Sequence, residues 1–217
     1  MDRIQVVQLL EKTGIVAVIR ASKEDDLSDI VKALIDGGVR ALEITMTTPY
    51  AVDVIKQLSQ SLNAGDDFLI GAGTVLDGAT AEAVIHAGAK FIVSPVCKPE
   101  LLETAHRYDC AVFPGAFTPT EILAAWEGGA DVVKVFPAGR FGPKYFKDIH
   151  GPLPQIKLTP TGGVNLDNTA EFIKYGASFV GVGTALLDKQ LIHQQNWKGL
   201  SAHARKFIEA VQRGKNG

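Results

Sequence analysis

Two charged residues stand inside short apolar segments, a placement that needs a physical reason. Lys134 interrupts the segment 132–136 (VVKVF), and Glu43 interrupts the segment 41–45 (ALEIT). Burying an ammonium or carboxylate group costs several kcal/mol unless the charge is paired or neutralised. An apolar setting also lowers the pKa of a lysine, which leaves the neutral amine that attacks a carbonyl carbon. We therefore predict Schiff-base chemistry at Lys134; the alternative is a Lys134–Glu43 ion pair that only closes the core.

Two glycine-rich segments near the C-terminus, 160–164 (PTGGV) and 181–185 (GVGTA), are candidates for binding an anion. Glycine lets the backbone approach a ligand closely, and backbone N–H groups at the start of a helix bind phosphate. A short helix that begins at Thr184 would direct its dipole at such an anion. The alternative is tight packing at strand ends. The residues expected at the phosphate are Thr161, Gly162, Gly163, Gly183 and Thr184.

The hydrophobic pattern predicts the scaffold that positions these residues. Short β-branched apolar segments alternate with longer amphipathic ones, which indicates repeated βα units and a parallel sheet. Several strand-like segments are apolar throughout, as strands covered on both faces are. The eight predicted strands are residues 15–19, 40–45, 68–71, 91–94, 111–113, 131–136, 157–160 and 179–182.

The segments between the strands have helical spacing and end in glycine. Apolar residues from Leu27 to Ile35 recur every three or four positions, and Gly37 and Gly38 then end this helix. A glycine also follows each of three other predicted helices. These helices cover residues 79–87, 119–127 and 167–175, and an additional helix is expected at residues 2–11.

Eight βα units fit a single domain, residues 1–217, folded as a TIM (β/α)8 barrel with an extra N-terminal helix. The alternative is a doubly wound open sheet, which usually carries a GxGxxG turn after its first strand. Here Arg20, Ala21 and Ser22 follow that strand instead. Barrel enzymes place catalytic groups at the C-terminal strand ends and commonly bind phosphate after strands seven and eight. The two glycine-rich segments occupy those loops, so a phosphorylated ligand is predicted.

Several other residues fall at predicted strand ends. Alternation along the strands predicts that Lys134 and Glu43 both point into the barrel and meet near its mouth. Arg20 ends the first strand, where its guanidinium could clamp a carboxylate; the alternative is a solvated surface arginine. Thr74 ends the third strand and offers a hydroxyl to the ligand. The segments 94–95 (SP) and 114–115 (PG) are expected to shape the floor and wall of the site.

Composition and charge exclude other classes of function. The 22 Lys and Arg residues nearly balance the 24 Asp and Glu residues, and the two signs are interspersed, which argues against a nucleic-acid partner. The longest uncharged stretch, residues 175–187, has 13 residues, whereas a membrane-spanning helix needs about 20. Residues 1–14 lack the pattern of a signal peptide, so a cytoplasmic protein is expected.

Cysteine and histidine usage argues against a metal site. Cys97 and Cys110 have no potential ligands at metal-binding spacing, and we expect both to be buried free thiols. No histidine falls at a predicted strand end beside a carboxylate or serine, which disfavours a histidine-based triad. Neither a metal nor another cofactor is expected. The histidines, expected to face solvent, are His86, His106, His150, His193 and His203.

A set of short motifs between residues 15 and 187 resembles, in order and spacing, the 2-keto-3-deoxy-6-phosphogluconate (KDPG) and 4-hydroxy-2-oxoglutarate (KHG) aldolase family. The resemblance implies a TIM barrel, a class I aldolase that needs no metal, and a homotrimer. The motifs are 43–45 (EIT), 71–75 (GAGTV), 93–95 (VSP), 114–115 (PG), 118–121 (TPTE), 134–137 (KVFP) and 160–164 (PTGGV).

The resemblance also implies roles for particular residues. Lys134 would form the Schiff base and Glu43 would shuttle protons. Thr74, Pro95 and Phe136 would line a pyruvate pocket. The phosphate would be held by Gly162, Gly163, Gly183 and Thr184.

One position departs from the family pattern. Many members carry an arginine four residues after the catalytic glutamate, where it holds the substrate carboxylate, and this chain has Thr47 there. Arg20 is the candidate replacement. Relatives that act on the galactonate epimer also lack this arginine, so the stereochemistry of the substrate stays open.

We therefore predict a class I aldolase that cleaves a 2-keto-3-deoxy-6-phospho sugar acid to pyruvate and glyceraldehyde 3-phosphate. KDPG is the expected substrate, with KHG as a second candidate. The alternatives are an aldolase for the galactonate epimer, and a non-covalent sugar-phosphate isomerase or epimerase that uses Lys134 and Glu43 as acid and base. A sugar-phosphate binding protein without catalysis is the remaining alternative.

Overall fold

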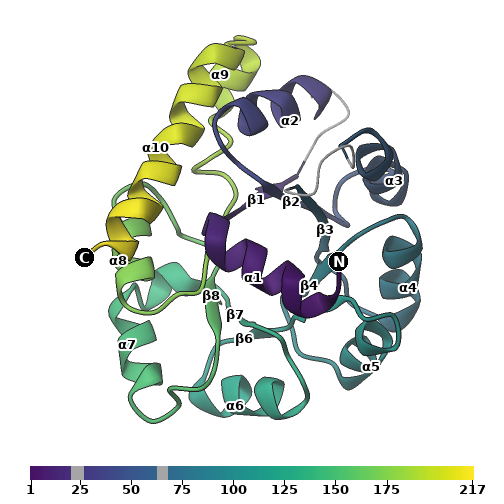
Figure 1. Cartoon of the computed structure of the whole chain (residues 1–217), viewed down its shortest axis with the longest axis vertical. Helices are drawn as coiled ribbons and strands as arrows, with labels where there is room; N and C mark the ends of the chain where they lie inside the picture. The colour runs from purple at the N-terminus through teal and green to yellow at the C-terminus, as the bar shows by residue number, and fades with distance from the viewer. Residues whose placement is uncertain (21–26, 63–67) are drawn as a thin grey trace.

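A ring of parallel strands surrounded by helices forms the protein (Figure 1). The computed structural model describes residues 1–20, 27–62 and 68–217, so Ala21 and Ser22 lie outside the described residues. Hydrogen-bonded strands follow the order β5-β4-β3-β2-β1-β9 in one sheet and β6-β7-β8 in the other. The strands are β1 (Ile15–Ile19), β2 (Ala41–Thr45), β3 (Leu69–Gly73), β4 (Phe91–Val93), β5 (Ala111–Phe113), β6 (Gly115–Ala116), β7 (Val133–Val135), β8 (Leu158–Pro160) and β9 (Val180–Val182).

Two connections join these sheets into a barrel. On one side, only Pro114 separates β5 from β6, so the predicted fifth strand continues into the second sheet. Proline has no N–H to donate, which explains the break in the ladder at this point. On the other side, parallel bridges link Thr161 to Gly181 and Leu158 to Ala177. The predicted (β/α)8 barrel is thereby confirmed, with the fifth strand divided in two.

Helices cover the outside of the barrel, and glycines follow four of them as predicted, although the N-terminal helix extends to Thr13, two residues beyond its predicted end. Gly38, Gly88, Gly129 and Gly176 follow four of the helices with φ between +96° and +107°, a conformation that favours glycine. The helices are α1 (Arg3–Thr13), α2 (Leu27–Asp36), α3 (Ala51–Leu62), α4 (Gly78–His86), α5 (Pro99–Arg107), α6 (Pro119–Glu127), α7 (Lys144–His150), α8 (Thr169–Lys174), α9 (Lys189–His193) and α10 (Trp197–Lys215), with a 3-10 turn at Ala138–Arg140.

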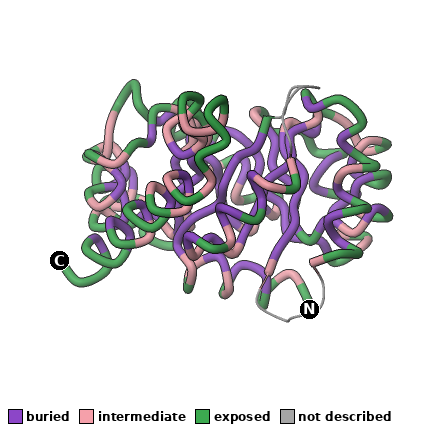
Figure 2. Tube along the Cα trace, turned by 90° about the horizontal axis from the view of Figure 1, so that it is seen from above, coloured by how far each residue is buried: buried purple, intermediate pink, exposed green. Residues whose placement is uncertain are grey.

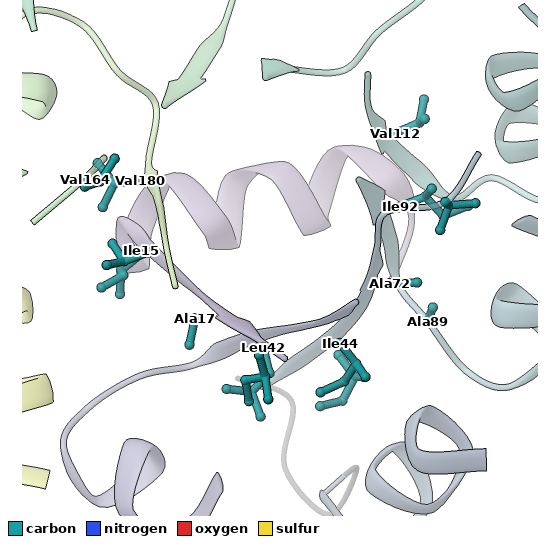
Figure 3. Close-up of a cluster of buried hydrophobic side chains, with 14 of the residues drawn as sticks. Ile15, Ala17, Leu42, Ile44, Ala72, Ala89, Ile92, Val112, Val164 and Val180 are labelled. Atoms are coloured by element: carbon teal, nitrogen blue, oxygen red, sulfur yellow. The ribbon is translucent and has the colours of Figure 1, made fainter. Parts of the chain in front are cut away.

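Side chains on alternate strand positions form two separate apolar layers. One layer points outward from the strands to the helices, and Figure 3 shows Ile15, Leu42 and Ile44 on that outer side. The other layer fills the inside of the barrel and includes Phe91 and Phe113. The strands are accordingly buried, while the outer helix faces are exposed (Figure 2).

The extra N-terminal helix closes one end of the barrel. Helix α1 lies across the ring in Figure 1, and its Val6, Val7 and Leu10 belong to the inner apolar layer. Lys215 at the end of α10 fixes this helix, because its Nζ donates to the carbonyls of Glu11 and Lys12 at 2.7 and 2.8 Å. Helix α1 thus covers the N-terminal end, and the opposite end, where the strands have their C-terminal ends, is the one at which barrel enzymes carry their sites.

Some predictions about single residues are wrong. Cys110 is buried as expected, but Cys97 is exposed, because it lies in the loop after β4. His86 and His193 face solvent, whereas His106, His150 and His203 are half-buried. Each of these three donates through Nε2 to a loop carbonyl, a tertiary contact that sequence periodicity does not reveal.

No helix within residues 1–20, 27–62 and 68–217 is both long and apolar enough to cross a membrane. In the same part of the chain, no group of three or more His, Cys, Asp and Glu side chains is arranged to hold a metal ion.

Candidate active site

Lys134 and Glu43 both lie on the inner face of the barrel. Their neighbours show the alternation: Val133 and Val135 belong to the outer apolar layer, and Val132 belongs to the inner one. The side chains are buried, with 5% of Lys134 and 3% of Glu43 exposed. The structure thus places both charged residues inside the barrel, as alternation predicts.

Burial shifts the pKa of each group in the direction that favours the neutral form of that group. Desolvation lowers the pKa of Lys134, and the nearby charge of Arg20 lowers it further, while Glu43 opposes both effects. For Glu43, desolvation raises the pKa, and the charges of Lys134 and Arg20 oppose this shift. The ion pairs of the described residues do not include one between Lys134 and Glu43. The two groups therefore form no direct ion pair that closes the core, although the charge of each acts on the pKa of the other.

Two glycines of β3 make room beside Glu43. A Cβ at Gly73 would overlap Glu43 Oε1, and a Cβ at Gly71 would overlap the ring of Phe91. Gly71 is also the register partner of Glu43 on the neighbouring strand. The carboxyl group therefore lies over β3 in a space that any side chain at position 73 would fill.

The neighbours of Lys134 on the two flanking strands are Gly115 and Thr159. A Cβ at Gly115 would overlap the carbonyl group of Pro95, so this half-buried proline packs close to the strand beside Lys134. Thr159 is 3% exposed, and its hydroxyl donates to the Phe179 carbonyl at 2.8 Å. The sequence prediction did not include Thr159; its inward position in the alternation was the available signal.

Of the expected pyruvate-pocket residues, Phe136 lies close to the end of Lys134. The Lys134 Nζ lies 5.1 Å from the centroid of the half-buried Phe136 ring. Thr74, directly after β3, has a φ of +59°, which is strained for a threonine. Such strain clusters at ligand-binding and active sites.

Arg20 and Thr47 lie at the open end of the barrel, and both are exposed. The charge of Arg20 acts on both Lys134 and Glu43, so the structure brings this arginine close to the buried pair. The Thr47 hydroxyl lies 2.8 Å from the hydroxyl of the buried Thr45. A cation is therefore available at Arg20 and not at position 47.

The loop after β8 begins beside β9. The bridge between Thr161 and Gly181 joins the start of this loop to that strand, and a Cβ at Gly181 would lie 2.5 Å from Thr161 Oγ1. Gly162 and Gly163 have φ values of +79° and +84°. In the part of the chain that the structure describes, the N–H groups of Gly163, Thr184 and Ala185 donate to no backbone carbonyl. Unpaired N–H groups on adjacent loops can bind an anion.

The helix predicted to begin at Thr184 is a single turn. The N–H groups of Leu186 and Leu187 donate to the Gly183 carbonyl at 2.9 and 3.0 Å, and the chain then leaves the turn. Asp188 caps the next helix, α9, which begins only at Lys189. The prediction of a helix that begins at Thr184 is therefore wrong, and the backbone N–H groups of the turn are what it could offer to an anion.

This chain is similar to known proteins over most of its length. The sequence profile of the family described as KDPG and KHG aldolase matches residues 6–203. A 2-dehydro-3-deoxy-phosphogluconate aldolase from Pseudomonas aeruginosa is 36% identical, over 93% of this chain and 90% of the relative. A 2-dehydro-3-deoxy-6-phosphogalactonate aldolase from Escherichia coli is 34% identical, over 95% of this chain and 100% of the relative.

The solved structures include one with a trapped reaction intermediate. KDPG aldolase from Legionella pneumophila, with pyruvate captured as a covalent carbinolamine, superposes with a TM-score of 0.83. It is 30% identical, and the alignment covers 92% of this chain and 96% of that one. The profile match and these relatives each span most of the chain. The protein therefore belongs to the KDPG and KHG aldolase family.

Proposed function

We propose that this protein is a class I aldolase that cleaves KDPG to pyruvate and glyceraldehyde 3-phosphate. The observation that carries the proposal is the buried Lys134, whose pKa is lowered, next to the buried Glu43, whose pKa is raised. A lysine of this kind supplies the neutral amine that a Schiff base requires.

Formation of the Schiff base uses both residues. The Lys134 Nζ attacks the C2 ketone of the substrate, and the product is a carbinolamine. Glu43, whose raised pKa favours the protonated form, gives its proton to the departing hydroxyl, which leaves as water. The resulting iminium carries a positive charge that can accept an electron pair.

Cleavage then uses Glu43 as a base. Its carboxylate takes the proton of the C4 hydroxyl, directly or through a water, and the C3–C4 bond breaks. The electron pair of that bond moves into the iminium to give an enamine, while glyceraldehyde 3-phosphate departs. Protonation of the enamine at C3 and hydrolysis of the imine release pyruvate and restore the Lys134 amine.

Binding roles follow from the positions around this pair. The pyruvate end of the substrate is lined by Thr74, Pro95 and Phe136. Many family members bind the substrate carboxylate with an arginine at the position of Thr47; in this chain Arg20 takes that role. The phosphate lies against the paired loops, where the proposed contacts are Thr161, Gly162, Gly163, Gly183 and Thr184.

The first experiment is mass spectrometry after incubation with pyruvate and borohydride. A stable adduct on the Lys134 peptide, absent from Lys134→Met, supports the imine mechanism. If pyruvate binds without forming an adduct, the proposal fails and a non-covalent isomerase or epimerase takes its place. Binding of sugar phosphate without any turnover would instead indicate a binding protein.

A second candidate substrate is the galactonate epimer of KDPG. Two observations favour it: position 47 is threonine, and the Escherichia coli relative is a phosphogalactonate aldolase. Comparing kcat/KM for KDPG, its galactonate epimer and KHG decides among the three substrates.

We further propose a homotrimer that works in the cytoplasm. Exposed apolar side chains at the open end of the barrel, including Tyr50, Val96 and Phe141, support self-association. Two free cysteines suit a reducing compartment. Sedimentation equilibrium of the purified protein tests the assembly, and a monomer at all concentrations would contradict it.

A further inference from the structure

A contact from the C-terminal helix fixes the turn that follows β9. Residues 183–187 form this turn, which is closed by the bonds from Leu186 and Leu187 to the Gly183 carbonyl. The carbonyl of Ala185 accepts a further hydrogen bond from His203 Nε2 on α10, at 2.8 Å. His203 is therefore linked to the loop that carries two of the proposed phosphate contacts, although it lies 18 residues further along the chain.

The His203 ring is itself held by packing. It meets the ring of Phe207 edge-on, with 5.4 Å between centroids and 83° between planes. Phe207 is fully buried in the core. Helix α10 extends over 19 residues, and its Lys215 is bonded to the end of α1. The imidazole thus projects from a rigid support, which suits a group that positions a loop.

The bond also removes an electrostatic obstacle to anion binding. A carbonyl oxygen carries partial negative charge and repels a phosphate placed nearby. His203 donates a hydrogen bond to the Ala185 oxygen. Within the described residues, the N–H groups of Thr184 and Ala185 donate to no backbone carbonyl. Because a carbonyl can only accept, the His203 Nε2 must carry a hydrogen.

We propose that His203 is a positioning residue for phosphate binding, because it holds the 183–187 turn with the N–H groups of Thr184 and Ala185 free to bind the phosphate. The proposal rests on the phosphate site of the proposed function. His203 acts only through the turn and does not touch the substrate.

The test compares His203→Leu, which removes the donor, with His203→Gln, whose amide nitrogen can reach the same carbonyl. Loss of one hydrogen bond should raise KM for KDPG about three- to tenfold in His203→Leu, with kcat unchanged. The apparent Kd for inorganic phosphate, measured by ³¹P NMR line broadening, should rise equally. His203→Gln should restore both values, and pyruvate–borohydride trapping should be unaffected in both variants.

His106→Leu is the matched control. His106 is also half-buried and also donates through Nε2 to a loop carbonyl, that of Gly129, at 2.9 Å. Gly129 precedes β7, at the opposite end of the barrel from the phosphate loops. General destabilisation would therefore affect both Leu variants alike, whereas the proposal requires weaker phosphate binding only in His203→Leu.

Three results would overturn the proposal. They are unchanged phosphate affinity in His203→Leu, an equal loss in His106→Leu, and failure of His203→Gln to restore binding. The phosphate measurement needs no turnover, so it tests His203 even if the wild-type protein cleaves no aldol substrate. Failure of the proposed function would appear separately, as a missing borohydride adduct in the wild type.

Discussion

Glu43 on β2 extends into the space that Gly73 leaves open on β3. An ideal Cβ at Gly73 would overlap Glu43 Oε1 and would lie 2.6 Å from Cδ and 2.7 Å from Cγ. The Glu43 carboxyl group therefore occupies the volume that a side chain at position 73 would need. The position of the Glu43 carboxyl group thus depends on a residue that carries no side chain.

Gly73→Ala should displace the Glu43 carboxyl group. Because general acid–base catalysis contributes about 10²–10⁴-fold, we expect kcat to fall by roughly 100-fold while Lys134 still forms some imine with pyruvate. Steady-state kinetics and borohydride trapping measure the two effects. Gly151→Ala is the control, since a Cβ there lies no closer than 3.4 Å to its neighbours. Equal kcat values for the two variants would contradict this assignment.

Glu43→Gln should retain the shape of the side chain and remove its acid–base function. Turnover should fall by about 10²–10⁴-fold, and slow imine formation should persist because Lys134 is intact. Single-turnover cleavage of KDPG, compared with trapping by pyruvate, separates the two steps. Wild-type cleavage rates in this variant would exclude Glu43 as the proton carrier.

The pH dependence of imine formation should report the charges around Lys134. Its neutral amine is the nucleophile, so trapping should increase as pH rises through a pKa below the ordinary lysine value of 10.5. The Glu43 charge raises this pKa and the Arg20 charge lowers it. Glu43→Gln should therefore move the midpoint to lower pH, and Arg20→Ala should move it to higher pH. Shifts in the opposite directions would show that these charges do not act on Lys134 as described.

Lys134→Met should stabilise the protein while abolishing its activity. Burying an ionisable group without an ion pair is costly, so replacing it by an apolar side chain of similar length should increase the free energy of unfolding. The pKa of Lys134 is lowered by folding, so between that value and 10.5 the unfolded chain binds the extra proton and wild-type stability rises with pH. Urea denaturation at several pH values should show this rise in the wild type and less of it in Lys134→Met. A less stable variant would contradict the argument.

Sequence patterns were sufficient to predict where the strands lie and that Lys134 and Glu43 point inward, because both predictions follow from local periodicity. They did not reveal the fit between Gly73 and Glu43, which depends on the register of two strands. The interruption of strand pairing at Pro114 and the hydrogen bond from His203 to the Ala185 carbonyl also depend on tertiary structure, so local periodicity does not predict them. The sequence predicts a helix that begins at Thr184. The structure has a single turn there, and the next helix begins only after its cap, Asp188.

Arg20→Ala should weaken binding of the substrate carboxylate. A bidentate guanidinium–carboxylate contact is one of the stronger polar interactions, so KM for KDPG and the concentration of pyruvate needed for trapping should both rise by about tenfold or more. Arg20→Lys should recover only part of this loss, because a lysine cannot form the bidentate contact. An unchanged KM would show that Arg20 does not bind the substrate carboxylate.

Gly139→Ala should separate phosphate binding from imine chemistry. Gly139 lies in the turn after β7, its N–H donates to the Gly162 carbonyl at 2.8 Å, and a Cβ there would lie 2.8 Å from Gly163 Cα. Both contacts are to backbone, so the loop after β8, which carries the proposed phosphate contacts, must shift to accommodate a methyl group. KM for KDPG should rise, whereas trapping by pyruvate, which has no phosphate, should be unchanged. If both reactions weaken together, the loop after β8 supports the whole site and not the phosphate alone.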